Sequence, residues 1–422
     1  MAPILSLTMT PGRGVLPPTS QTQLLYVLLD LVPGLNVANV RMPLNVALVL
    51  DRSGSMIVDG KIKRLREAVR FLIDQFEPQD TLSIITFIKT AEMVMPAQRV
   101  QDREAIKRKV DRIDTDSIPD WYIPTMMKLP SETDALPALQ AGIREVKKGQ
   151  SAGRLSRMLV LTDGQLMHPE QVIQAGQQAG AAGIPIIALG IGTDWNDELL
   201  QSLGGASGGY VDYIAQPQQI EQVFRVALAS LQATIVQNAV LTLQPSTGVE
   251  LRKVWRASPL IADLGNSTRQ VLGEIEKNVG QMLLVELAVH PHHAGRYRVL
   301  LAKVVYDVPA IKLSGEQIQA EVLVGFDMNA GQLPVSPKVM NVAERVTAFR
   351  LETRALEEIQ SGNISGATEK LQSAANILQN QGEQDLARTL RLEADNLQQS
   401  GQMSADGTKT IKFKGGQTRR LD

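Results

Sequence analysis

Three small oxygen-bearing side chains follow a strand pattern near residue 50. Asp51, Ser53 and Ser55 stand at alternate positions after the apolar run LNVALVL, which is typical of a central parallel strand. A second aspartate, Asp163, ends another apolar run, and Thr133 stands in the loop SETDALPAL before a predicted helix. Ligands of an open parallel sheet bind where the carboxyl ends of its strands meet. The spacing therefore predicts that oxygens from three segments converge at one edge of a sheet.

Oxygen ligands of this kind indicate a hard divalent cation. Carboxylates and hydroxyls without histidine or cysteine favour Mg²⁺, Ca²⁺ or Mn²⁺ over zinc. Each segment also has a simpler explanation, because Asp51 to Ser55 suits a helix cap and turn, TDG is a common turn, and Thr133 suits a cap of the next helix. Their combination on strand ends favours one metal site, whose predicted ligands are Asp51, Ser53, Ser55, Thr133 and Asp163.

The elements that must position these residues alternate between strand and helix. From residue 44 to 232, apolar runs of strand length alternate with amphipathic stretches such as KIKRLREAVRFLIDQF. This alternation predicts an α/β domain with a doubly wound parallel sheet. Residues 1–43 and 233–335 instead hold strand patterns without helices, which predict a β-sandwich. Because the first two strands have no partners nearby, we expect the α/β domain to be inserted into the sandwich.

The last part of the chain is predicted to be helical. Residues 336–402 are rich in Ala, Leu, Glu and Gln with a 3.6-residue period, and two short turns divide them. They predict a helical hairpin or bundle of two or three antiparallel helices. Residues 403–422 hold few large apolar side chains and are expected to form a flexible tail.

The order Asp-x-Ser-x-Ser in VLDRSGSM resembles the metal-ion-dependent adhesion site of von Willebrand factor type A domains. The resemblance covers about residues 44–232, and Thr133 and the Asp163 of VLTDG match the later threonine and aspartate of that site. It implies one bound Mg²⁺ or similar ion, ligated through hydroxyls, with some carboxylates acting through water. It also implies an open coordination position that an acidic residue of a partner protein completes.

Two features depart from the family pattern. SETD replaces the Gly-Gly that often precedes the threonine, and the stretch 111–132 is long for this loop. That stretch contains Thr125 as a rival for Thr133, and Trp121 and Tyr122 either pack inside or form contact anchors beside the metal. The whole layout resembles bacterial proteins in which this domain sits in a β-sandwich, akin to the heavy chains of inter-α-trypsin inhibitor.

The favoured function is a metal-dependent protein-binding scaffold or adaptor, without catalysis. One alternative is a hydrolase that uses Ser207 of GASGG or a metal-activated water, but a helix precedes and a strand follows Ser207, the reverse of a nucleophile elbow. A second is a structural module with a vestigial metal site, and a third is an adaptor for an AAA+ ATPase, as the family resemblance suggests. The HPHH segment, which contains His290 and His292, suits a hairpin turn better than a zinc site.

Composition excludes several other classes. The net charge of −1 provides no bulk attraction to nucleic acid, and no apolar run reaches the roughly 18 residues of a membrane span. The chain has no cysteine and no signal-peptide pattern, so a cytoplasmic location is expected. No phosphate-binding glycine motif supports a nucleotide cofactor. In the tail, Thr410 and Thr418 resemble phosphate acceptors for a phosphothreonine-reading partner.

Overall fold

The computed structural model describes residues 4–34, 41–114, 133–151, 153–277, 279–328, 330 and 334–417. The chain forms two units, one made of Met42–Gln232 and the other of Met1–Arg41 with Ala233–Asp422. Thr125, Trp121, Tyr122 and Thr418, which the sequence singled out, lie outside the described residues. No helix in the described ranges combines the length and the apolarity that crossing a membrane requires.

The first unit is built on one six-stranded sheet with the order β6-β5-β4-β7-β8-β9. Neighbouring strands run parallel from β5 to β9, and only β6 is antiparallel to its neighbour. The strands are β4 (Leu44–Asp51), β5 (Thr81–Phe87), β6 (Ala91–Arg99), β7 (Leu155–Thr162), β8 (Ile186–Ile191) and β9 (Tyr210–Ile214). The doubly wound prediction is confirmed, but it omitted β6, whose polar, Pro-containing sequence is typical of an edge strand.

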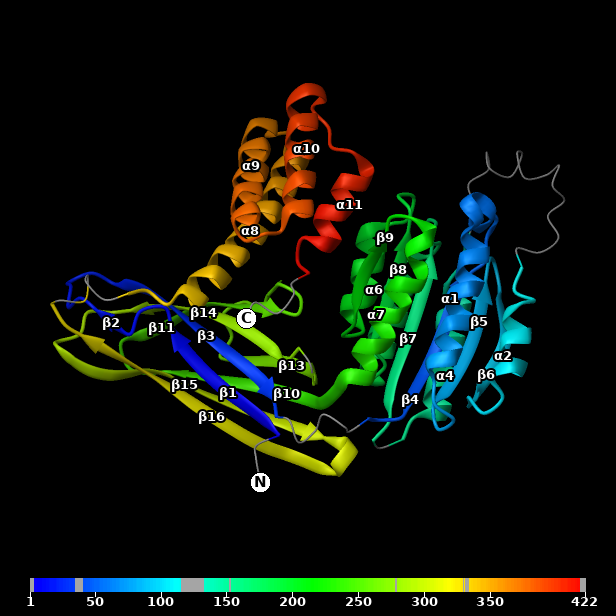
Figure 1. Ribbon diagram of the computed structural model, residues 1–422, viewed down its shortest axis with the longest axis horizontal. Coiled ribbons are helices and arrows are strands. Elements are labelled where there is room, and N and C mark those ends of the chain that lie inside the picture. Colours follow the sequence, from blue (N-terminus) through cyan, green and yellow to red (C-terminus); the bar gives the residue numbers. More distant parts are fainter. Residues whose placement is uncertain are drawn as a thin grey trace. The chain divides into compact units, whose positions relative to one another are not determined.

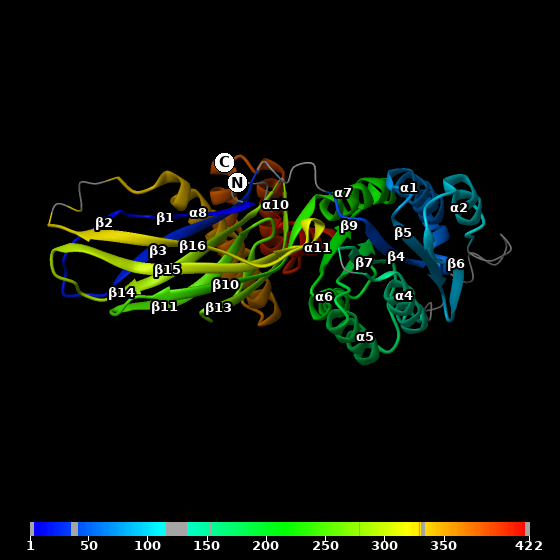
Figure 2. The ribbon, with the colours of Figure 1, turned by 90° about the horizontal axis from the view of Figure 1, so that it is seen from below.

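Helices cover both faces of this sheet (Figures 1 and 2). α4, α5 and α6 lie on one face, and α1 and α7 lie on the other. The helices are α1 (Lys61–Gln75), α2 (Arg103–Val110), α4 (Leu136–Gly149), α5 (Pro169–Ala181), α6 (Asp197–Ala206) and α7 (Ile220–Ala233), with the 3₁₀ segments η2 (Gly54–Gly60) and η3 (Pro217–Gln219). Every residue of β4 and β7 is buried, because helices cover both faces of a parallel sheet.

The second unit begins with a sandwich of two five-stranded sheets, β1-β3-β14-β11-β12 and β13-β10-β15-β16-β2. Its early strands are β1 (Leu5–Pro11), β2 (Val15–Leu16) and β3 (Gln23–Pro33). Its later strands are β10 (Thr234–Pro245), β11 (Val249–Ser258), β12 (Ala262–Asp263), β13 (Arg269–Glu276), β14 (Gln281–Val289), β15 (Gly295–Val308) and β16 (Leu313–Phe326), with η4 (Pro309–Ile311). β3 pairs with β14 over nine residues, from Gln23↔Val289 to Leu31↔Gln281, which confirms the insertion.

Three long antiparallel helices follow the sandwich (Figure 1), namely α8 (Pro337–Gln360), α9 (Ile364–Asn380) and α10 (Gln384–Ser400). The turns between them, at Gly362 and Gly382, have positive φ angles that glycine adopts without strain. The start of α8 shares a hydrophobic cluster with the outer face of one sandwich sheet, where Val339 and Val342 lie with Trp255 and Leu284. The predicted helical bundle is therefore present and is packed onto the sandwich.

The prediction of a flexible tail from residue 403 is wrong for the described residues. Ala405–Lys414 forms helix α11, with Ile411 and Phe413 buried. The Ser404 side chain caps it by accepting from the Gly407 N–H at 2.9 Å, and Glu393 on α10 accepts from the Ser404 hydroxyl at 2.6 Å. A Cβ at Gly407 would lie 2.2 Å from the Glu393 carboxyl carbon, so glycine permits this close packing. Local composition suggested a tail because the segment holds only a few apolar side chains. These side chains are buried only because the helix packs against segments that are distant in sequence.

Candidate metal centre

Two strand ends bring the predicted aspartates to one edge of the sheet. Asp51 is the last residue of β4, and Asp163 directly follows β7, which lies beside β4 in parallel register. The chain runs outward from β4 to β5 and β6, and outward from β7 to β8 and β9 on the other side. The strand order therefore reverses between β4 and β7. Such a switch point is where open α/β sheets place their ligand sites.

A hydrogen-bond network joins four of the five predicted residues. Ser53 donates its backbone N–H to Asp51 Oδ1 at 2.8 Å, and the hydroxyls of Ser53 and Ser55 lie 2.9 Å apart. Ser55 donates to Asp163 Oδ1 at 2.7 Å, so oxygens from the β4 and β7 ends form one chain of contacts. Thr162, which the sequence analysis missed, donates to Asp51 Oδ2 at 2.6 Å. Its position directly before Asp163, at the end of a buried strand, is the sequence feature by which Thr162 could have been predicted as part of the site.

Thr133 lies beside the Asp163 segment but outside this network. It forms a parallel bridge with Leu166, and its carbonyl accepts from Met167 N–H at 2.9 Å. Its hydroxyl is fully buried and has no hydrogen-bond partner among the described residues. It does not cap α4, because Asp134 accepts from the Leu136 N–H there. A buried hydroxyl without a partner is costly, so this oxygen is a candidate for binding something that is not protein.

The charges of the site are concentrated and buried. Burial, with the nearby Asp163 carboxylate, raises the pKa of Asp51 to about 6 against the opposing hydrogen bonds from Thr162 and Ser53. The ammonium of Lys61, the first residue of α1, lies 2.6 Å from Asp163 Oδ2. The side chain of Asp163 is inaccessible to solvent and that of Lys61 is 14% exposed, so this ion pair is mostly desolvated. Lys61 was also missed, since a lysine that begins a helix carries no sequence signal of its own.

These donors fit a hard divalent cation. The hydrogen-bonded network offers two carboxylates and the hydroxyls of Ser53, Ser55 and Thr162, all of them oxygen ligands of the kind that Mg²⁺, Ca²⁺ and Mn²⁺ prefer. Within the described ranges, no group of three or more His, Cys, Asp or Glu residues is placed to hold a metal. Hydroxyl ligands would therefore have to complete the coordination. The unsatisfied Thr133 hydroxyl is the structural feature that favours such a ligand set.

Comparison with known proteins identifies the fold around this site. The sequence profile of the von Willebrand factor type A domain matches residues 45–226. Residues 45–226 are a von Willebrand factor type A (VWA) domain. A second profile, the Sll0103-like C-terminal alpha-helical domain, matches residues 337–421, which include α8 to α11. The helical nature of residues 405–414 thus agrees with a family pattern as well as with the structure.

Whole-chain relatives share this arrangement. The uncharacterized protein Sll0103 of Synechocystis is 27% identical over 396 residues, covering 88% of this chain and 87% of its own. A von Willebrand factor type A protein from Catenulispora acidiphila superposes with a TM-score of 0.76 at 18% identity, over 99% of this chain and 98% of its own. The ArnB paralog VWA2 from Sulfolobus acidocaldarius gives a TM-score of 0.55 at 14% identity, over 98% and 99%. At these identities the two structures support the fold alone.

The expected distant likeness to inter-α-trypsin inhibitor heavy chains is also present. Human heavy chain H4 is 26% identical over 180 residues, which cover 40% of this chain but only 18% of that protein. The likeness is confined to part of each chain, so it supports a similarity of that part alone and not a shared activity.

The alternative sites have structural roles in this chain. Ser207 is buried at the end of α6, where its hydroxyl donates to Gly204 O at 2.7 Å and accepts from Ile186 N–H at 2.8 Å. The HPHH segment joins β14 to β15, which belong to different sheets of the sandwich, so the expected hairpin turn is wrong and the segment is a connection between the two sheets. There His290 contacts Glu250 at 2.9 Å, while the His292 ring stacks on Phe326 with centroids 4.9 Å apart. These two histidines are directed to different partners, which does not suit a shared zinc ion.

Proposed function

We propose that the VWA domain binds a partner protein through a divalent cation held by Asp51, Ser53, Ser55, Thr133 and Asp163. The observation that carries this proposal is the continuous chain of oxygens from Ser53 through Ser55 to Asp163. A second support is the buried Thr133 hydroxyl, which has no hydrogen-bond partner among the described residues and belongs to a segment bridged to Leu166 in the loop after Asp163. When bound, the cation supplies an electrophilic position for an incoming carboxylate. We favour Mg²⁺, with Ca²⁺ and Mn²⁺ as the other hard cations that suit these ligands.

The arrangement favours binding over catalysis. The Ser207 hydroxyl is engaged in three backbone hydrogen bonds at a helix end, which disfavours its use as a nucleophile. Lys61 is held in an ion pair with Asp163 and therefore serves to neutralise the site. We propose that the chain acts as a non-enzymatic scaffold or adaptor, and the absence of cysteine suits a cytoplasmic location. An AAA+ ATPase or a phosphothreonine reader stays a hypothesis for the partner.

Cation binding is tested first by titrating Mg²⁺ into the metal-free chain by calorimetry. We expect one site in the wild type and no measurable binding in Asp51→Ala, with the fold retained by circular dichroism. Asp194→Ala is the matched control, because this exposed aspartate lies in the loop after β8 and is outside the network. Equal loss in both variants, or full binding by Asp51→Ala, would contradict the proposed site.

Partner binding is tested second. Affinity capture from the native host with Mg²⁺, and again with EDTA, should yield proteins that are present only with the cation and only with the wild-type chain. Proteins captured equally by wild type and Asp51→Ala in EDTA would instead favour a structural module with a vestigial site.

A further inference from the structure

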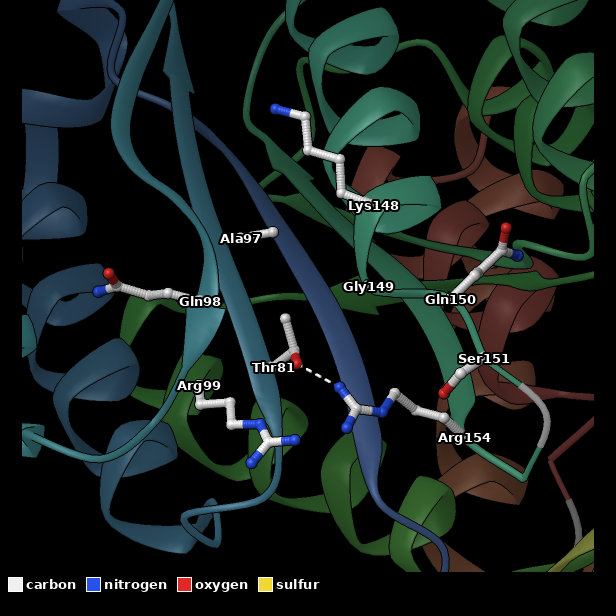
Figure 3. A pocket seen from close by; sticks show the side chains of 9 residues that line it. All are labelled: Thr81, Ala97, Gln98, Arg99, Lys148, Gly149, Gln150, Ser151 and Arg154. Atoms are coloured by element: carbon white, nitrogen blue, oxygen red, sulfur yellow. Dashed lines mark hydrogen bonds between the residues drawn. The ribbon is translucent and has the colours of Figure 1, made fainter.

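A cationic pocket lies at the opposite edge of the VWA sheet from the candidate metal centre (Figure 3). Its volume is about 330 Å³, and none of the nine residues that line it is acidic. Three of them carry positive charge, namely Arg99, Lys148 and Arg154, and Thr81 and Ser151 add hydroxyls. A hollow with several cations and no lining carboxylate is electrostatically suited to an anion.

The strand ends explain why these residues meet. Thr81 is the first residue of β5, Arg99 is the last residue of β6, and the two are directly paired in the antiparallel ladder. Arg154 stands directly before β7, whose far end precedes Asp163. The eight residues of β7 span roughly 26 Å at the usual strand rise, so this pocket and the metal centre are separate.

Two guanidinium groups are available to a ligand here. Figure 3 shows Arg99 and Arg154 on two sides of Thr81. Arg154 donates to the Thr81 hydroxyl and to Gln79 O, the latter at 3.2 Å, which orients its planar group. The Arg99 guanidinium has no protein hydrogen bond or ion pair within the described part of the chain. Two nearby guanidinium groups repel each other unless an anion lies between them.

Lys148 differs from the two arginines. Its ammonium is bonded to Glu145, and its side chain extends away from Thr81 in Figure 3. The charge of Lys148 is thus already compensated by Glu145. Lys148 lines the pocket, but its ammonium is directed away from Thr81. This difference makes Lys148 the matched control for Arg99.

We propose that this pocket binds a phosphate-type dianion between Arg99 and Arg154. Arginine donors match the oxygens of phosphate in a bidentate manner, and charge-assisted hydrogen bonds of this kind are stronger than neutral ones. The cavity is larger than inorganic phosphate, which leaves room for the small organic part of a phosphate ester. Free phosphate and a small phosphate ester share the chemistry that the arginines recognise.

The test is calorimetric titration of the full chain with inorganic phosphate and, separately, with glycerol 3-phosphate at constant ionic strength. We expect saturable binding, reduced at least tenfold by Arg99→Gln and changed less than twofold by Lys148→Gln. Tighter binding of glycerol 3-phosphate would identify an ester as the preferred source, and equal binding would identify free phosphate. Arg99→Gln is the decisive variant because the exposed Arg99 side chain makes no hydrogen bond or ion pair with the described residues whose loss would disturb the fold.

Three results would overturn the proposal. One is the absence of saturation by either probe at concentrations up to about 10 mM, which is above the millimolar dissociation constants of weak binding. Another is equal weakening by Arg99→Gln and Lys148→Gln, because that would indicate general charge screening. The third is unchanged binding in Arg99→Gln. None of these depends on Mg²⁺, so the outcome is independent of the proposed metal-dependent function.

Discussion

At the scale of single residues, the candidate metal centre is a buried charge cluster that the protein already neutralises in part. The carboxylates of Asp51 and Asp163 are both buried, and the Lys61 ammonium supplies one compensating positive charge. Removing two carboxylates from water without compensation is costly, so a nearby cation lowers that cost. If a divalent ion binds among the same oxygens, its charge opposes that of Lys61. The ion and the lysine then compete electrostatically for Asp163.

This competition predicts the effect of removing Lys61. Lys61→Gln should raise the affinity for Mg²⁺ by roughly tenfold, because one repelling charge next to a ligand is removed. Calorimetric titration of wild type and variant measures the difference. Lys63→Gln is the control, since Lys63 is exposed on the same helix and makes no hydrogen bond or ion pair with the site residues that the structure describes. An affinity that stays equal or falls in Lys61→Gln would show that the lysine supports the bound state.

Substitution of Thr133 is expected to raise the stability of the metal-free protein and to lower its affinity for Mg²⁺. Thr133→Val keeps the shape of the side chain and removes a buried hydroxyl that has no hydrogen-bond partner in the described part of the chain. The metal-free protein should gain about 1 kcal/mol in free energy of unfolding, because an unsatisfied polar group is no longer buried. The same variant should bind Mg²⁺ more weakly, because a ligand is lost. Urea unfolding in EDTA and calorimetry measure the two effects, and loss of stability in EDTA would instead indicate a structural role for the hydroxyl.

At the scale of elements, α8 carries a buried ion pair against the C-terminal segment. The side chains of Arg345 and Glu352 are 3% and 2% exposed, with 4.0 Å between Nη1 and Oε1. Arg345 also donates to Gly415 O at 2.8 Å, which ties the end of α11 to α8. Neither Glu352 oxygen has a hydrogen-bond partner in the described structure. Burial raises the pKa of Glu352 to about 7, and the positive charge of Arg345 only partly offsets this.

A raised pKa fixes the direction of a pH effect. The folded state holds the Glu352 proton more tightly than the unfolded state, whose glutamate titrates near 4.5. The tighter binding of this proton stabilises the folded state. Its contribution to the free energy of unfolding is complete below about pH 4.5 and is lost as the pH rises through 7, by about 3 kcal/mol in total. Glu352→Gln should lack this component of the pH dependence.

Urea unfolding of wild type and Glu352→Gln at pH 5 and pH 8 measures it. Glu357→Gln, which removes an exposed carboxylate from the same helix, should retain the wild-type dependence. A pH dependence that is the same in Glu352→Gln as in wild type would contradict the assignment.

At the scale of the whole molecule, the insertion separates two cores. The sandwich core is formed by residues from 5–31 and 235–326, with no member from 42–232. The two chain segments that border the insertion also end close together in the sandwich, because Leu31 pairs with Gln281 and Thr234 pairs with Glu276. The fold therefore has a natural position at which one unit can be removed from the other.

Excision is therefore expected to leave two folded proteins. Residues 42–232 alone should unfold cooperatively on heating, and so should the remaining chain when residues 34 and 233 are joined by about eight Gly and Ser residues, which bridge roughly 16 Å. Circular dichroism during thermal unfolding measures both. As a control, removing residues 4–34 should prevent folding of the sandwich, because it deletes β1, β2 and β3, whose Leu25, Val27 and Leu29 belong to the sandwich core. A non-cooperative transition in either excised part would show that the units depend on each other.

The sequence by itself determined the architecture of the VWA domain and the place of its oxygen cluster. The fully apolar pattern of β4 and β7 reports burial on both faces, and parallel strands end at one edge, so the convergence of Asp51 and Asp163 was predictable. The alternate spacing of Ser53 and Ser55 after the end of β4 predicted that their hydroxyls join the same cluster. These features are local, and periodicity records them directly.

Only the tertiary structure decided which other side chains face the cluster and what the chain does after residue 403. Thr162 and Lys61 reach the aspartates through the packing of β7 and α1, and the isolation of the Thr133 hydroxyl is a property of its surroundings. Helix α11 has too few apolar residues to be recognised locally, and its burial depends on contacts with Glu393 on α10 and on the bond between Arg345 of α8 and Gly415. A sequence pattern records the need for burial, whereas the identity of the burying partner arises only when distant segments pack together.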